Sequence, residues 1–146
     1  MSVPDPVLGR GLVLDVSTVR LHLSGDVYTA AMIGAALEYE RPLVIPALVL
    51  VQAYREAVPG PARMRLVGLV SVVTEPDLSD EVSRATARDI GTVCQLAGVE
   101  DLSIGHALWA ALERRNQPDP LYDWAIVTEY PEVYRKVAPT VPTGWR

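Results

Sequence analysis

The sequence predicts an α/β fold, in which a mainly parallel sheet of four to five strands is flanked by helices. Short runs of branched apolar residues recur along the chain without alternation, as expected for strands buried on both faces. Segments with helical spacing separate these runs, which is typical of connections between parallel strands. The chain has 146 residues, of which 49% are hydrophobic and 21% charged, so we expect one domain over residues 1–146, with 1–10 as a loose lead-in.

The amino-terminal part alternates strands with helices. A continuous apolar run over Leu12–Asp15 indicates the first strand, and helical turns follow over Ser17–Leu23. A helix from Asp26 to about Glu40 is predicted because its small apolar residues recur at helical spacing and its first residue can cap it. Leu43–Ile45 indicates the second strand, and the proline after it suits the first position of a helix over Ala47–Ala57.

The middle of the chain is predicted to be mostly helical. A short helix over Ala62–Gly68 precedes a third apolar run, Leu69–Val73, which we interpret as a strand. A long helix is expected over Ser79–Ala97, and Gly98 can end it in the left-handed conformation. Ser103 can cap a further amphipathic helix that runs to about Arg115.

The carboxyl-terminal part supplies the remaining elements. Two prolines within Asn116–Asp123 indicate a surface loop, and Ala125–Thr128 indicates a fourth strand. Pro131–Val137 is predicted to be helical. Thr140–Pro142 is a candidate edge strand, because an edge position tolerates proline.

Charge and cysteine content exclude several classes of protein. The formal net charge is −5, so a strongly basic surface for nucleic acid is absent and RNA binding would need a local patch. The single cysteine, Cys94, excludes an internal disulfide and fits a reducing compartment. No secretory leader and no apolar run of about 20 residues is evident, so a cytoplasmic protein is expected.

Asp15 is the first candidate functional residue, because it ends a buried strand at the carboxyl edge of the predicted sheet. Ligands collect at this edge in open α/β folds. Asp15 can equally cap the helix that begins near Ser17, with no further role. Other known site types are missing: the chain has no Gly-rich phosphate loop and no Gly-x-Ser-x-Gly motif, and His22, His106 and one cysteine do not have zinc spacing.

Four short stretches, taken in order and spacing, resemble one known family. They are Leu12-Val13-Leu14-Asp15-Val16-Ser17, Ile45-Pro46-Ala47-Leu48, His106-Ala107-Leu108-Trp109-Ala110-Ala111 and Ile126-Val127-Thr128. Their arrangement is similar to that of the PIN domain, the metal-dependent nuclease fold of toxin–antitoxin ribonucleases. The resemblance implies acidic side chains from four places that hold Mg²⁺ or Mn²⁺, which activates water against a phosphodiester.

Of the four positions that are acidic in this family, only the first has an acidic residue in this sequence. Asp15 matches, whereas the others fall on Gln52, His106 and Tyr130, with Glu129 beside the last of these. Mg²⁺ prefers charged oxygen ligands, and an imidazole suits Zn²⁺, Ni²⁺ or Cu²⁺ better. The resemblance therefore implies a degenerate site with no metal or weakly bound Mg²⁺ or Mn²⁺, at which Ser17 and Thr128 could also bind a ligand.

Three hypotheses follow from the resemblance and its departures. The first is a PIN-like protein that is weak or inactive as a nuclease and binds a protein partner or RNA. The second is an active ribonuclease in which Asp15 and Glu129 hold one ion and Gln52 or His106 assists. The third is a nitrogen-preferring metal site on His106 and Asp15, with no nuclease role. Gln52 and Tyr130 are also interpretable as buried structural residues. An antitoxin-like partner or a homodimer is a further implication of the resemblance.

Overall fold

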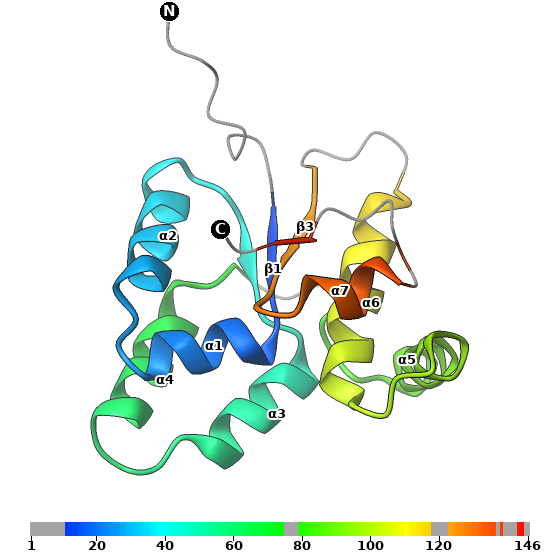
Figure 1. Ribbon diagram of the computed structural model, residues 1–146, viewed down its shortest axis with the longest axis horizontal. Helices are drawn as coiled ribbons and strands as arrows, with labels where there is room; N and C mark the ends of the chain where they lie inside the picture. The colour runs from blue at the N-terminus through cyan, green and yellow to red at the C-terminus, as the bar shows by residue number, and fades with distance from the viewer. Residues whose placement is uncertain (1–10, 75–78, 118–122, 137, 139–142, 145–146) are drawn as a thin grey trace, which may run out of the picture.

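The computed structural model describes residues 11–74, 79–117, 123–136, 138 and 143–144, and it shows a small parallel sheet flanked by helices (Figure 1). In this view α1, α2 and α4 lie to the left of the sheet, α3 lies below it, and α5 and α6 lie to its right. The elements in chain order are β1 (Leu12–Leu14), α1 (Val16–Leu23), α2 (Val27–Glu38), β2 (Leu43–Val44), α3 (Ala47–Glu56), α4 (Pro61–Val72), α5 (Arg84–Ala97), α6 (Leu102–Arg115), β3 (Ala125–Val127), α7 (Pro131–Arg135) and β4 (Thr143–Gly144).

The sheet has the order β2-β1-β3-β4, and all of these pairings are parallel. Leu12 of β1 is paired with Leu43 of β2 on one side and with Ala125 of β3 on the other. Every residue of β1, β2 and β3 is buried. This explains why these strands have no polar alternation: helices cover both faces of the sheet.

Side-chain caps and glycines set the helix boundaries. Asp26 accepts a hydrogen bond from the backbone N–H of Thr29 at 2.9 Å and thereby begins α2. Ser83 begins α5 in the same way, by accepting from the N–H of Thr86 at 3.1 Å. Gly98 ends α5 with a φ of 66°, which few residues other than glycine adopt without strain.

The α/β class and the flanking helices are confirmed, but the sheet has shorter strands than predicted and lacks the strand predicted over Leu69–Val73. The strand prediction over Leu69–Val73 is wrong, because these residues form the last turn of α4 and its cap. The apolar run is helical because Leu66 and Leu69 face the core while Val67 and Val72 face outward. β2 and β4 have only two residues each, and the predictions for 1–10 and 140–142 lie outside the described residues.

Two helix starts also differ from prediction. α6 begins slightly earlier than expected, since Asp101 rather than Ser103 caps it and accepts from the Ser103 N–H at 2.9 Å. α5 begins at Arg84 rather than near Ser79, because Ser79 and Asp80 form a buried turn before it.

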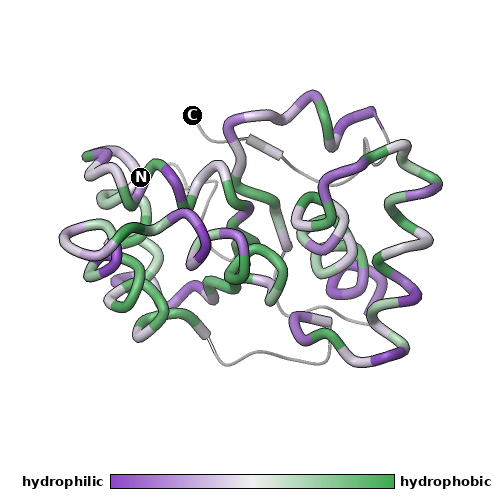
Figure 2. Tube along the Cα trace, turned by 90° about the horizontal axis from the view of Figure 1, so that it is seen from below, coloured by the Kyte–Doolittle hydropathy of each residue, from purple (hydrophilic) through white to green (hydrophobic). Residues whose placement is uncertain are grey.

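The core lies between the sheet and the two groups of helices. Apolar residues prevail along α1 to α4 in Figure 2, whereas polar residues are frequent along α5. Cys94 of α5 is a free, buried thiol. Within the part of the chain that the structure describes, no helix is long and apolar enough to cross a bilayer.

Candidate functional site

The carboxyl ends of β1 and β3 meet at one edge of the sheet, and two candidate residues lie there. Asp15 follows β1 and Thr128 follows β3, and these strands are direct parallel neighbours. The backbone N–H of Asp15 donates to the carbonyl of Val127 at 3.4 Å, and the hydroxyl of Thr18 donates to the same carbonyl at 2.7 Å. The parallel register therefore brings Asp15, the first predicted site position, close to Thr128, which was predicted only as a possible ligand-binding residue.

The Asp15 carboxylate is buried and is bonded by three donors of the protein. Its Oδ1 accepts from the hydroxyl of Ser17 at 2.6 Å and from the backbone N–H of Thr18 at 3.2 Å. Its Oδ2 accepts from the hydroxyl of Tyr134 at 2.8 Å. Only 2% of Asp15 is exposed. The capping interpretation of Asp15 is thus confirmed, and its second oxygen has a separate partner on α7.

Ser17 and Thr128 connect this carboxylate to the loop after β3. Their side-chain oxygens lie 3.3 Å apart. Ser17 Oγ also accepts from the backbone N–H of Glu129 at 2.9 Å, and Thr128 Oγ1 accepts from the N–H of Tyr130 at 2.9 Å. Both hydroxyls are buried. They hold the loop in place, and these contacts use the atoms that were predicted to bind a ligand.

Tyr134 is a hydrogen-bond donor that stays protonated. Burial, followed by the nearby Asp15 carboxylate, raises the pKa of Tyr134 far above its ordinary value. The residue is 1% exposed. The phenol is therefore neutral at physiological pH, and its hydroxyl proton is directed at Asp15 Oδ2.

The hydrogen-bond partners of His106 do not include Asp15. Its Nδ1 accepts from the backbone N–H of Leu48 at 3.3 Å, and its Nε2 lies 2.7 Å from the carbonyl oxygen of Ser79. Because Nδ1 accepts, the ring proton is on Nε2, which donates to Ser79. Burial lowers the pKa of His106, so the ring is neutral at pH 7.

A buried ion pair lies beside His106 and was not foreseen. Arg114 of α6 pairs with Asp80 through both of its terminal nitrogens, and Nη1 also donates to Ser79 Oγ at 3.0 Å. The Arg114 guanidinium stacks on Trp124, 4.6 Å from the ring centroid. The carbonyl of Asp80 in turn accepts from the N–H of Ala47 at 2.8 Å. This network ties α6 to the start of α3.

The remaining predicted site residues make no bond to the Asp15 carboxylate. Gln52 is half-buried on α3, and its side chain makes no hydrogen bond to any residue that the structure describes. Glu129 is exposed and contacts Ser17 through its backbone only. Tyr130 is 53% exposed, so the expectation that it is a buried structural residue is wrong. The buried tyrosine is Tyr134, one helical turn later.

One cation near this edge is already paired. Arg20 of α1 donates from Nε to both oxygens of Glu56, at 2.8 and 3.1 Å. This hydrogen-bonded pair raises the pKa of Arg20, with smaller contributions from Tyr130 and Asp101. Arg20 therefore offers little uncompensated positive charge to a phosphate.

These residues do not fit a magnesium or manganese centre. Both oxygens of Asp15 accept bonds from the protein, and both ring nitrogens of His106 are also bonded. Among the described residues, no three of His, Cys, Asp and Glu gather where an ion could bind. A hard dication requires several free, charged oxygens at one point. The same contacts count against the nitrogen-preferring site on His106 and Asp15.

Sequence reasoning missed Tyr134, Asp80 and Arg114. Tyr134 carried a weak signal, as the aromatic residue of a predicted helix that closes the sheet. Asp80 and Arg114 are 34 residues apart in the chain, and nothing in the sequence pattern pairs them.

Comparison with models of known protein families gives no match, and comparison with curated proteins finds no significant relative.

Proposed function

We propose that this chain is a PIN-like protein that acts by binding and does not cleave RNA by a metal-dependent mechanism. The observation that supports the proposal is the Asp15 carboxylate, whose two oxygens accept from Ser17, Thr18 and Tyr134. These three donors already use most of the about four lone-pair positions of the carboxylate, so a metal ion would compete with them, and no cluster of further ligands is present among the described residues. The group that would carry the chemistry in an active site serves here as an anchor for α1 and α7.

A protein is favoured over RNA as the binding partner. The net charge of −5 repels a polyanion. Arg20, a cation of α1 near the loop after β3, is neutralised by Glu56 at 2.7 Å. Phosphate contacts from uncompensated Lys and Arg supply most of the affinity for nucleic acid, so the pairing of this cation counts against RNA.

The test is a cleavage assay on structured and unstructured RNA with Mg²⁺ and Mn²⁺, comparing the wild type with Asp15→Ala. We expect no turnover in either protein, and no salt-sensitive shift of a labelled RNA in fluorescence anisotropy. Turnover that disappears in Asp15→Ala would show that the alternative, an active ribonuclease, is correct. Tight binding of RNA without turnover would agree with the proposed loss of catalysis, but it would show that the partner is RNA and not a protein.

A further inference from the structure

The turn between α3 and α4 presents apolar side chains to solvent. Val58 in this turn is 67% exposed, and Met64 and Val67 of α4 are 75% and 55% exposed. Figure 1 shows the turn at the lower border of the structure, away from the sheet. A protein surface normally carries apolar side chains singly, so a group of them within one turn and the start of the next helix indicates a contact surface.

The turn has a fixed shape. Gly60 has a φ of 116°, a conformation that favours glycine, and a proline with restricted φ lies on each side of it. Nη2 of Arg63, in the first turn of α4, donates to the carbonyls of Tyr54 and Ala57 at the end of α3, at 3.2 and 3.0 Å. Binding therefore does not have to order this segment first, which favours its use as a contact surface.

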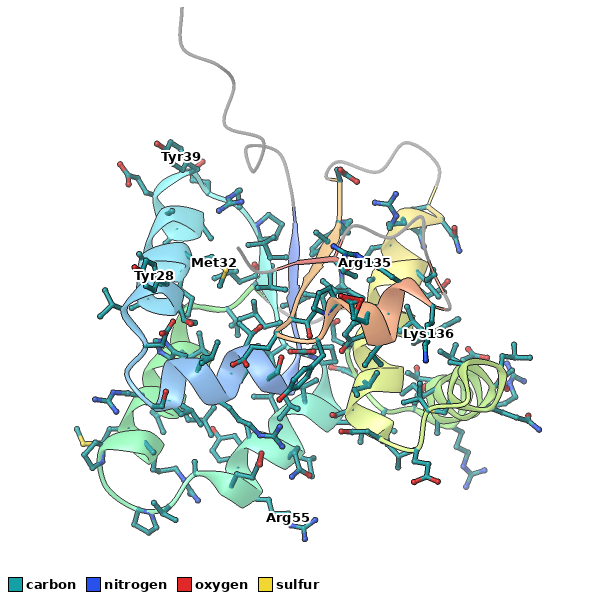
Figure 3. The ribbon with its side chains drawn as sticks, viewed as in Figure 1. Tyr28, Met32, Tyr39, Arg55, Arg135 and Lys136 are labelled. Carbon is teal, nitrogen blue, oxygen red and sulfur yellow. The ribbon has the colours of Figure 1, made fainter. Side chains whose placement is uncertain are left out.

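Three arginines lie beside these apolar side chains without a carboxylate partner. Among the described residues, no carboxylate forms an ion pair with Arg55, Arg63 or Arg65. The acidic residue next to Arg55 in the sequence, Glu56, is paired with Arg20 at 2.7 Å instead. Figure 3 shows Arg55 at the lower border of the structure, pointing away from the ribbon. The turn therefore carries uncompensated positive charge.

This local charge matters more for an anionic surface than the net charge of −5 does. All of the acidic residues except Glu56 lie outside α3, α4 and their connection. Exposed charges are screened beyond about 8 Å at physiological ionic strength, so carboxylates on distant elements oppose the contact weakly. Each arginine that reaches an anionic bilayer strengthens binding by about fivefold.

A bilayer surface matches these features better than RNA or an acidic protein. RNA phosphates would pair with the arginines but would leave Val58 and Met64 against polar groups. A base could not stack on the face of Tyr54 that the Arg63 guanidinium covers, 5.4 Å from the ring centroid. An acidic protein would need a groove fitted to this projecting turn. The interfacial layer of a bilayer takes up apolar side chains and attracts arginines to its head groups without a fitted pocket.

We propose that the α3–α4 turn binds peripherally to the surface of an anionic bilayer. Val58 and Met64 enter the interfacial layer, and Arg55 and Arg63 remain at the level of the head groups. The inference does not depend on the proposed function, since Asp15 and its neighbours take no part in this contact.

Co-sedimentation of the full chain with lipid vesicles tests the proposal. Vesicles made of equal parts of phosphatidylcholine and phosphatidylglycerol should bind the chain. Vesicles of phosphatidylcholine alone should bind it at least about tenfold more weakly, because they offer no net negative charge. Added salt should weaken binding to the anionic vesicles, because it screens the arginines.

Substitutions at the turn separate the two contributions. Arg55→Gln should weaken binding to the anionic vesicles by about fivefold. Met64→Gln should weaken it by about fivefold as well, because it removes the apolar side chain that enters the interface. Met64→Trp should strengthen binding, since tryptophan is favoured at the bilayer interface. A gain in this variant cannot result from misfolding.

The matched controls are Arg84→Gln and Leu96→Gln on α5, which lies on the other side of the sheet in Figure 1. Both side chains are exposed, and Leu96 is 82% exposed. The controls should bind the anionic vesicles as tightly as the wild type. Circular dichroism should show the same helix content in all of the variants.

Three results would overturn the proposal. The first is a wild type that binds neither kind of vesicle, or binds both equally. The second is a set of variants in which Arg55→Gln and Met64→Gln bind as tightly as the wild type, or in which the α5 controls lose as much as they do. The third is a labelled RNA whose binding, in fluorescence anisotropy, is weakened by Arg55→Gln while the anionic vesicles stay unbound, which would assign the turn to RNA.

Discussion

Replacing Tyr134 with phenylalanine removes one hydroxyl from the buried contact with Asp15 and leaves the ring in place. That hydroxyl is the donor to Asp15 Oδ2, at 2.8 Å, whereas the Ser17 and Thr18 donors are both on Oδ1. The variant therefore leaves one oxygen of a carboxylate that is 2% exposed without its donor.

The expected loss follows from the kind of bond. A hydrogen bond to a charged group contributes about 1.5–3 kcal/mol, and an unsatisfied buried acceptor costs a similar amount. We expect Tyr134→Phe to lower the free energy of unfolding by about 2 kcal/mol. For a chain of this size, that corresponds to a fall in Tm of about 7 °C.

Urea denaturation followed by circular dichroism measures this loss. Tyr130→Phe is the matched control, because Tyr130 is 53% exposed and its hydroxyl bonds to no residue that the structure describes. The control should change stability by less than about 0.5 kcal/mol. In the double variant with Asp15→Asn, the two losses should not add, because the residues are in contact.

The reasoning would be refuted if Tyr134→Phe were as stable as Tyr130→Phe. The phenol would then not bond Asp15 in solution, and the carboxylate would be open to another partner.

Three further predictions concern buried contacts other than the one between Asp15 and Tyr134. Asp80→Asn leaves the buried Arg114 charge without its partner and should lower the free energy of unfolding by about 3–5 kcal/mol, measured by urea denaturation; a loss below about 1 kcal/mol would mean that the pair is solvated. Burial lowers the pKa of His106 below its ordinary value of 6.5, so the stability contributed by the neutral ring is complete well above pH 6.5 and declines as the pH falls below that value. Between pH 7.5 and about pH 5.5, the urea midpoint of the wild type should therefore fall more steeply than that of His106→Gln. Equal slopes for the two proteins would contradict this. A Cβ at Gly11 would lie 2.5 Å from the Trp124 ring, so Gly11→Ala should lower Tm by about 7 °C or more in a thermal melt, and an unchanged Tm would show that the ring can move aside.

The fold class could be predicted because strands buried in a parallel sheet are continuous apolar runs in the sequence. Leu12–Leu14 and Ala125–Val127 are short, apolar and unalternated, and both are strands. Leu69–Val73 has the same composition but is helical, since its local pattern does not distinguish a strand from a half-buried helix. The helical conformation is favoured because it buries Leu66 and Leu69 in the core.

The candidate site could be predicted in part. The parallel neighbourhood of β1 and β3 implies that Asp15 and Thr128 meet, and the structure brings them together through Ser17. The partner of Asp15 could not be predicted, because Tyr134 is 119 residues away and reaches the carboxylate only through the placement of α7. His106 fell on an expected ligand position, but its ring serves the start of α3 instead.

The most direct test of the account is a Mn²⁺ titration of the full chain by electron paramagnetic resonance, with Asp15→Asn measured in parallel. The account predicts that the wild type and the variant leave the same amount of Mn²⁺ free, because the Asp15 oxygens are occupied by protein donors. Saturable binding of one ion by the wild type, lost in Asp15→Asn, would contradict it.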